Sequence, residues 1–159
     1  MKEKEQARIL VIDDDDNVRN SLAAAFRKNG YLVDVAETGK EAIAKSRAIL
    51  YNLALVDLRL PDMNGLELLT QMREKTPKMV KIIVTGYPSL ENAIEAVNRG
   101  ANGYVVKPYT MEHLLQKVKE QLQKQQEAIR YSEEKVREFI EARAEEHDAR
   151  TSTKGTRKK

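Results

Sequence analysis

Several apolar segments of the sequence end in residues that can carry chemistry. These residues are acids, a hydroxyl and an ammonium: Asp13, Asp14, Asp57, Thr85 and Lys107. Neighbouring carboxylates repel one another unless a cation neutralises them, and Mg²⁺ suits a site made of oxygen ligands. An aspartate can act as a nucleophile and form an acyl phosphate, while an ammonium and a hydroxyl stabilise the transferred group. The set therefore favours Mg²⁺-dependent phosphoryl transfer onto Asp57.

Five short apolar segments predict strands that place these residues. They cover residues 8–12, 32–36, 53–57, 81–85 and 103–106. Near-continuous apolar runs are typical of parallel strands that are buried on both faces. Because parallel strands end at the same edge of a sheet, the polar residues after them are expected to converge on Asp57.

Helical patterns alternate with these strands. The first has Leu22 and Phe26 on its apolar face, with Asp16 or Asn17 as its expected N-cap and Gly30 just past its end. The others are expected over residues 41–50, from residue 66 to a stop at residue 77, from a cap at residue 89 to residue 99, and from residue 111 onward. The alternation predicts a doubly wound α/β fold with a five-stranded parallel sheet and helices on both faces. Periodicity alone does not give the strand order.

Composition narrows the class of protein. The chain has 159 residues, 41% of them hydrophobic and 33% charged, and no cysteine, which excludes disulfides and thiolate metal sites. No apolar run is long enough for a membrane span or a signal peptide, so we expect a cytoplasmic protein without membrane insertion. Residues 151–159 contain four basic residues and no acid, and without them the formal charge changes from +3 to −1. The basic excess therefore lies in this C-terminal segment and does not indicate a nucleic-acid-binding face.

Four motifs resemble those of the response regulator receiver domain of two-component signalling, which has a CheY-like fold. They are Ile9-Leu10-Val11-Ile12-Asp13-Asp14-Asp15, Asp57-Leu58-Arg59-Leu60-Pro61-Asp62-Met63-Asn64-Gly65, Thr85-Gly86 and Lys107-Pro108. Arg19, Gly30-Tyr31, Gly39, Glu41-Ala42, Arg99-Gly100-Ala101 and Tyr104 also fall where that family has them. The resemblance covers roughly residues 7–125 and implies the strand order 2-1-3-4-5.

The resemblance also implies a role for each residue of the site. Asp57 would accept a phosphoryl group from the phosphohistidine of a histidine kinase or a phosphotransfer protein, and Lys107 would contact that group. Mg²⁺ would be held by the side chains of Asp14 and Asp57 and by the backbone carbonyl of Arg59, with Asp13 acting through a bound water.

Further implied roles concern switching. The bond from Lys107 to Pro108 would be cis. Thr85 would move toward the phosphoryl group and Tyr104 would swing inward behind it. This switch would change the surface of the fourth helix, fifth strand and fifth helix, which would bind a downstream protein.

Arg59 and Tyr87 follow Asp57 and Thr85 by two residues each. In the family, these positions flank the path of the water that hydrolyses the acyl phosphate. Both side chains are large here, which predicts a long-lived phosphorylated state. The resemblance also implies that the protein catalyses its own phosphorylation and dephosphorylation at Asp57, without being a conventional enzyme.

The chain continues past the predicted receiver domain, residues 7–123. Residues 124–150 predict a helical extension, and residues 151–159 a disordered basic tail. Leu115, Leu122, Ile129 and Val136 repeat every seven residues, as in a coiled coil, whereas the other heptad position is half polar. A helical contact, including a homodimer, and a single solvated helix both remain open. No pattern for a DNA-binding domain follows, so we expect signalling through protein contacts without direct DNA binding.

Other functions fit the sequence less well. A phosphorylation-independent interaction module that assembles through its long helix is the main alternative, and the intact acid, hydroxyl and lysine set argues against it. A phosphatase of the haloacid dehalogenase type would need an acid two residues after the nucleophile, where this chain has Arg59. A flavodoxin-like cofactor binder would need a phosphate-binding loop where this chain has four consecutive aspartates.

Overall fold

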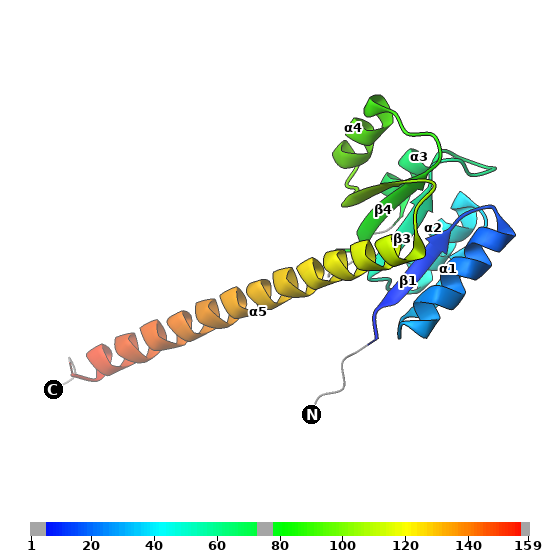
Figure 1. Cartoon of the computed structure of the whole chain (residues 1–159). Coiled ribbons are helices and arrows are strands. Elements are labelled where there is room, and N and C mark those ends of the chain that lie inside the picture. Colours follow the sequence, from blue (N-terminus) through cyan, green and yellow to red (C-terminus); the bar gives the residue numbers. More distant parts are fainter. Residues whose placement is uncertain (1–5, 73–77, 157–159) are drawn as a thin grey trace. The chain divides into compact units, whose positions relative to one another are not determined.

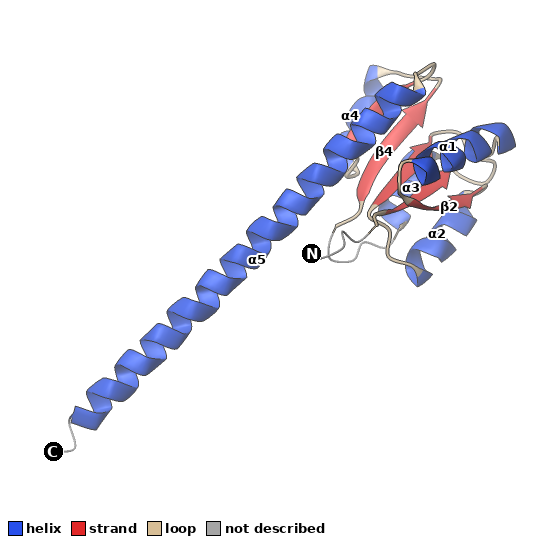
Figure 2. Ribbon diagram, turned by 60° about the horizontal axis from the view of Figure 1, so that its bottom comes forward, coloured by secondary structure: helices blue, strands red, loops and turns tan. Residues whose placement is uncertain are grey.

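The computed structural model describes residues 6–72 and 78–156, and residues 8–106 contain a parallel β-sheet (Figures 1 and 2). Five strands form this sheet: β1 (Arg8–Ile12), β2 (Leu32–Ala36), β3 (Leu53–Asp57), β4 (Val80–Thr85) and β5 (Gly103–Val106). Their order is β2-β1-β3-β4-β5, and every pair of neighbours is parallel. The fold class and the strand order expected from the sequence are both confirmed.

Four helices connect successive strands, and a fifth follows β5. They are α1 (Asp16–Lys28), α2 (Gly39–Ala48), α3 (Gly65–Gln71), α4 (Leu90–Asn98) and α5 (Met111–Thr156). The expected end of the third helix at Pro77 lies outside the described residues, and α3 ends at Gln71.

The two faces of the sheet carry separate cores, because successive side chains of a strand point to opposite faces. Ile9 and Val11 of β1 pack with residues of α1 and α5, whereas Leu10 and Ile12 pack with residues of α2, α3 and α4. All four side chains are almost fully buried. Burial on both faces explains why β1 and β3 are apolar along almost their whole length and why their acids lie at the carboxyl ends.

Capping side chains and glycines lie at the ends of the helices, and the predicted N-cap of α1 is corrected by one residue. Asp15 is the N-cap of α1, one residue before the predicted Asp16, and its carboxylate accepts hydrogen bonds from two backbone N–H groups of the first turn. Ser89 caps α4 as expected, in a reciprocal capping box with Asn92. Gly30 and Gly100 have φ angles of +90° and +95°, which glycine adopts without strain.

The chain divides into two units, residues 1–125 and 126–159. Within the first, Leu114, Val118 and Leu122 of α5 are buried in the core of the sheet. Gln125 is the last residue of this unit. Its side-chain amide donates to the main-chain oxygens of Asn52 at 2.9 Å and Lys78 at 2.8 Å.

The second unit continues α5 to Thr156, whereas the helix was expected to end near Arg150 and a disordered tail to follow. Residues 157–159 lie outside the described residues. The helical residues 126–146 expose several large apolar side chains: Tyr131, Val136, Phe139 and Ile140. Among the described residues, no helix combines the length and the apolar character needed to cross a membrane.

Gly65 allows the chain after β3 to turn tightly into α3. A Cβ atom there would lie 2.2 Å from the main-chain oxygen of Asp57 and 2.9 Å from the Cα of Leu58. Both contacts are with backbone, which cannot swing aside as a side chain can, and the Gly65 N–H donates to the Leu58 oxygen at 2.8 Å.

We therefore expect Gly65→Ala to lower the free energy of unfolding by about 2–3 kcal/mol, as forced overpacking does. Urea unfolding measures the change. Gly86→Ala is the control, because its added Cβ would come no closer than 3.9 Å to Lys107. Equal stability of the Gly65→Ala and Gly86→Ala proteins would contradict the close approach.

Candidate functional site

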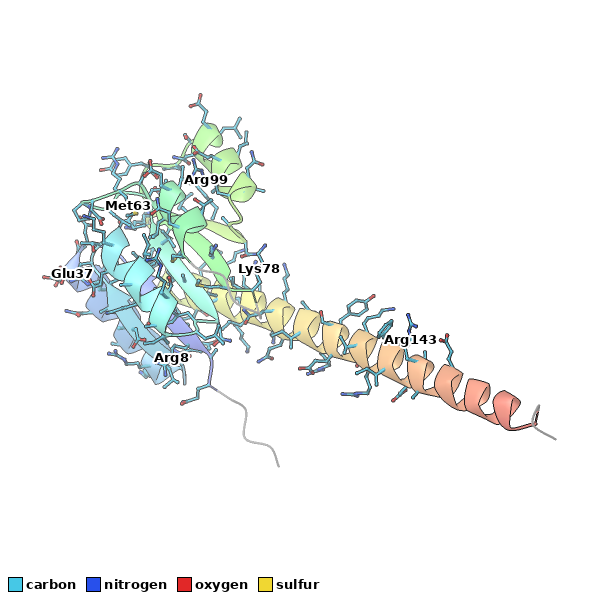
Figure 3. The ribbon with its side chains drawn as sticks, turned by 180° about the vertical axis from the view of Figure 1, so that it is seen from behind. Arg8, Glu37, Met63, Lys78, Arg99 and Arg143 are labelled. Atoms are coloured by element: carbon cyan, nitrogen blue, oxygen red, sulfur yellow. The ribbon has the colours of Figure 1, made fainter. Side chains whose placement is uncertain are left out.

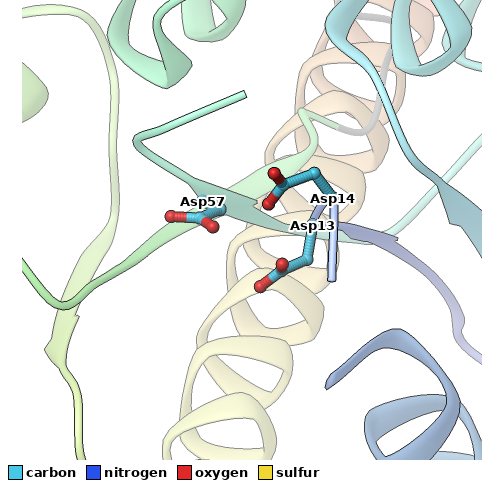
Figure 4. Close-up of side chains that lie close together, drawn as sticks. All are labelled: Asp13, Asp14 and Asp57. Atoms are coloured by element: carbon cyan, nitrogen blue, oxygen red, sulfur yellow. The ribbon is translucent and has the colours of Figure 1, made fainter. Parts of the chain in front are cut away.

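Three carboxylates meet at the carboxyl edge of the sheet (Figure 4). Asp13 and Asp14 follow β1, and Asp57 is the last residue of the neighbouring β3. Each offers one oxygen, and these atoms all lie within 4.8 Å of one another. The convergence predicted from parallel strand ends is therefore present for all three acids.

Lys107, just past β5, brings a positive charge to this cluster. Its Nζ lies 3.3 Å from Oδ2 of Asp13 and 3.6 Å from Oδ2 of Asp57. Burial alone would lower the pKa of Lys107, but the attraction of Asp13 and Asp57 outweighs it, and the pKa is raised. Lys107 thus stays protonated beside the carboxylates. The bond from Lys107 to Pro108 is cis, as predicted.

The surroundings of Asp57 affect its titration. Its side chain is 13% exposed. Burial raises the pKa of Asp57, and repulsion from Asp13 raises it further, while Lys107 and the backbone N–H of Arg59 oppose the change. A carboxylate that is destabilised in this way gains from any added cation.

Thr85 ends β4 and is fully buried. Its hydroxyl accepts a hydrogen bond from the backbone N–H of Tyr87 at 2.9 Å. The hydroxyl is therefore engaged with the loop that leads into α4. Its predicted contact with a phosphoryl group remains a prediction.

Arg59 and Tyr87 are in contact. The guanidinium carbon of Arg59 lies 3.3 Å from the centre of the Tyr87 ring, a cation–π arrangement between the loops after β3 and β4. Sequence analysis singled out both positions but did not predict that they touch. The Arg59 N–H also donates to Oδ1 of Asp57 at 3.3 Å, whereas metal ligation by its carbonyl remains a prediction.

Tyr104, in β5, reaches the N-terminus of α4. Its hydroxyl donates to the side-chain oxygen of Asn92, and the Asn92 amide donates to the main-chain oxygen of Tyr87 at 3.0 Å. Asn92 thereby connects the predicted switch tyrosine to the loop that carries Tyr87. This link was not predicted from the sequence, which indicated only a helix cap at Ser89.

Asp62 is a second residue that sequence reasoning left without a role. Its carboxylate accepts from the backbone N–H groups of Gly39 at 2.8 Å and Lys40 at 2.9 Å. The Gly39 N–H, followed by that of Lys40, lowers the pKa of Asp62. These hydrogen bonds connect the loop after Asp57 to the N-terminus of α2. Such a long-range contact cannot be predicted from an aspartate in a turn.

The three acids fit a hard divalent cation. The oxygens of Asp13, Asp14 and Asp57 come from separate carboxylates, and their spread of up to 4.8 Å is comparable with twice the Mg–O distance of about 2.1 Å. No nitrogen or sulfur ligand is present in this group, so its chemistry favours Mg²⁺ over a transition metal.

Comparison with known proteins agrees with this geometry. Residues 9–119 match the family model described as response regulator receiver domain. The regulatory protein AtoC of Escherichia coli is 37% identical over 107 residues, which are 67% of this chain and 23% of AtoC. The chain thus spans about a quarter of the length of that relative.

Two solved structures are similar over more than two thirds of this chain. A CheY-like receiver domain protein from Methanospirillum hungatei is 43% identical with a TM-score of 0.75, covering 78% of this chain and 99% of that one. A response regulator from Burkholderia pseudomallei, solved with a phosphorylated aspartic acid, a calcium ion and citrate, is 33% identical with a TM-score of 0.65. That match covers 69% of this chain and 65% of the other.

We expect Asp57→Asn to raise the melting temperature of the metal-free protein at neutral pH. The raised pKa means that the charged form of Asp57 is less favourable in the folded than in the unfolded chain, and the amide removes this charge. The gain should vanish below the ordinary pKa of 3.8, where the carboxyl is protonated in both states. Thermal unfolding with a chelator, at neutral pH and at about pH 3, measures both effects. A lower melting temperature of the variant at neutral pH would contradict the electrostatic argument.

Proposed function

Since this chain belongs to the response regulator receiver domain family, we propose that Asp57 is its phosphoacceptor and that phosphorylation there controls the binding of a partner protein. The observation that carries the proposal is the convergence of Asp13, Asp14, Asp57 and Lys107 on one edge of the sheet. The phosphorylated aspartic acid of the Burkholderia pseudomallei relative supports the same chemistry for this chain.

The donor would be the phosphohistidine of a sensor histidine kinase or a phosphotransfer protein. A carboxylate oxygen of Asp57 attacks the phosphorus, an O–P bond forms, and the N–P bond to the imidazole breaks. Lys107, already 3.6 Å from Asp57, stabilises the negative charge on the transferred oxygens. The product is an acyl phosphate on Asp57.

Asp14 and Asp57 would hold Mg²⁺ directly, with the Arg59 carbonyl as a third ligand and Asp13 acting through water. When bound, the ion would neutralise the acids and stabilise charge on the phosphoryl oxygens. The protein's own contribution is to fix these groups at strand ends, where the backbone holds them before any ligand arrives.

Switching would begin at Thr85. If its hydroxyl turns to the phosphoryl group, the Tyr87 N–H loses its acceptor, and the loop before α4 is released to rearrange. Tyr104 would follow, because its hydroxyl is bonded to Asn92 in this same network. The affected surface is apolar, since Leu90, Ile94 and Val97 of α4 are each more than half exposed. A downstream protein would bind there.

The second candidate function is assembly through the long helix, independent of phosphorylation. It is favoured by the exposed apolar side chains of Val136, Phe139 and Ile140. On either reading, residues 7–123 would form the receiver domain, residues 124–150 a helical extension, and residues 151–159 a basic tail. The labelling experiment below separates the two functions, because only a phosphoacceptor is labelled.

Incubation with acetyl phosphate and Mg²⁺ should add one phosphoryl group to the protein, detected by intact-mass spectrometry. Asp57→Asn should abolish the addition, and chelation of the metal should do the same, because the acid cluster then repels the anionic donor. Asp15→Asn is the control, since asparagine also caps helices and Asp15 is not a predicted ligand. Labelling that survives in Asp57→Asn would refute the assignment.

The phosphorylated protein should also decay slowly. The stacked side chains of Arg59 and Tyr87 lie between the loops beside Asp57, where they would exclude the attacking water. We expect the double variant Arg59→Asn, Tyr87→Glu to lose phosphate about tenfold faster, which is a barrier change of about 1.4 kcal/mol.

A phosphate-release assay measures this decay. Tyr131→Glu provides the control, because it breaks a second cation–π pair, with Lys135 at 5.5 Å, that lies on α5. Equal half-lives for the wild-type protein and the double variant would show that the pair does not restrict water.

A further inference from the structure

Arg19 is a buried cation beside the acid cluster. It lies in the first turns of α1 and is only 5% exposed, although arginine is seldom buried without a specific reason. Its Nη1 donates to the main-chain oxygen of Asp13 at 2.7 Å. Its Nη2 pairs with Glu37 at 3.2 Å and with Asp16. One guanidinium therefore joins the end of β1, the residue after β2 and the start of α1.

These contacts leave Asp13 with little freedom. Its N–H donates to the main-chain oxygen of Ala36 at 3.1 Å, and its carbonyl accepts from Arg19. Its carboxylate accepts from the N–H of Asp15 at 2.9 Å and faces Lys107 at 3.3 Å. Asp14 is thus held between Asp13, whose backbone is fixed on both sides, and Asp15, which caps α1.

Glu37 is one of the two acids that pair with Arg19, and it lies at the end of the sheet opposite Arg8 (Figure 3). Its side chain is 64% exposed, and that of Asp16 is 78% exposed. The guanidinium is therefore oriented by two carboxylates that remain hydrated, and it presents Nη1 toward the buried carbonyl. The guanidinium makes these bonds from two separate nitrogens in a fixed planar fork, whereas an ammonium carries all its donors on one nitrogen.

We propose that Arg19 is a positioning residue of the divalent-metal site. By holding the Asp13 carbonyl, it directs the carboxylates of Asp13 and Asp14 toward Asp57 and so sets the affinity for Mg²⁺. The inference rests on the proposed function, because it takes these three carboxylates as the metal site.

A positioning role and a pure charge effect predict opposite changes in Mg²⁺ affinity when Arg19 is replaced. A cation near the site repels Mg²⁺, so removal of the charge alone would strengthen metal binding. Loss of a group that orients the ligands would weaken it, typically by 10–100-fold. Substitutions that keep or remove the charge therefore distinguish the two effects.

The experiment is a titration of the full chain with MgCl₂. Binding is measured by calorimetry and by the NMR shifts of the backbone amides of residues 13–15. We expect Arg19→Lys, which keeps the charge, to weaken Mg²⁺ binding by about tenfold, and Arg19→Gln to weaken it also. The matched control is Arg27→Lys, because Arg27 also lies on α1 and also donates to a carbonyl, that of Val33 at 3.0 Å. That variant should bind Mg²⁺ like the wild-type protein.

Thermal unfolding of each variant separates positioning from general stability. Equal Mg²⁺ affinity of Arg19→Lys and wild type would overturn the proposal, as would tighter binding by Arg19→Gln. Absence of Mg²⁺ binding by the wild-type protein, or binding unchanged in Asp14→Asn, would instead refute the metal site itself.

If Arg19→Lys did not fold, Glu37→Gln would take its place, because Glu37 is exposed and helps to hold the guanidinium. Binding would then be compared at about 0.1 M and about 0.5 M NaCl, since salt screens a pure charge effect. Weaker binding that persists at high salt supports positioning, and an effect that disappears with salt overturns it.

Discussion

The attraction between Lys107 and the carboxylates of Asp13 and Asp57 is the interaction on which the site depends. It joins the end of β5 to the ends of β1 and β3, across a sheet whose interior is apolar. Three neighbouring acids would otherwise repel one another, and burial already raises the pKa of Asp57. One ammonium cannot neutralise three carboxylates, so the arrangement is left ready for a further cation.

The fold creates this situation because its strands are parallel and buried on both faces. Apart from Asp34 of β2 and Lys81 of β4, the strand interiors are apolar, so most polar groups lie at the strand ends. Parallel strands bring the carboxyl ends to one edge. Contacts between loops then fix the details. Arg19 holds the end of β1, Asp62 ties the loop after β3 to α2, and Asn92 links Tyr104 to the loop after β4.

The strands could be predicted because they follow from short apolar patterns that are local in the chain. The acid cluster and its lysine could be predicted because parallel strands bring the residues at their carboxyl ends together. The strand order came from family resemblance, since periodicity carries no information on which strands are neighbours. The stack of Arg59 on Tyr87 and the bond from Tyr104 to Asn92 could not be predicted in this way. Each depends on side-chain rotamers and on the distance between loops, which only the packed fold determines. α5 runs to Thr156, past the expected helix end near Arg150, because basic and polar residues are compatible with both a helix and a solvated tail.

The most direct test is a crystal structure of the protein with Mg²⁺ and beryllofluoride, which mimics a phosphoryl group. The account predicts that the mimic is bound to the Asp57 carboxylate, with Lys107 and Thr85 in contact with its fluorides and with the metal on Asp14 and Asp57. Beryllofluoride bound elsewhere, or Lys107 turned away into solvent with the mimic in place, would contradict the account.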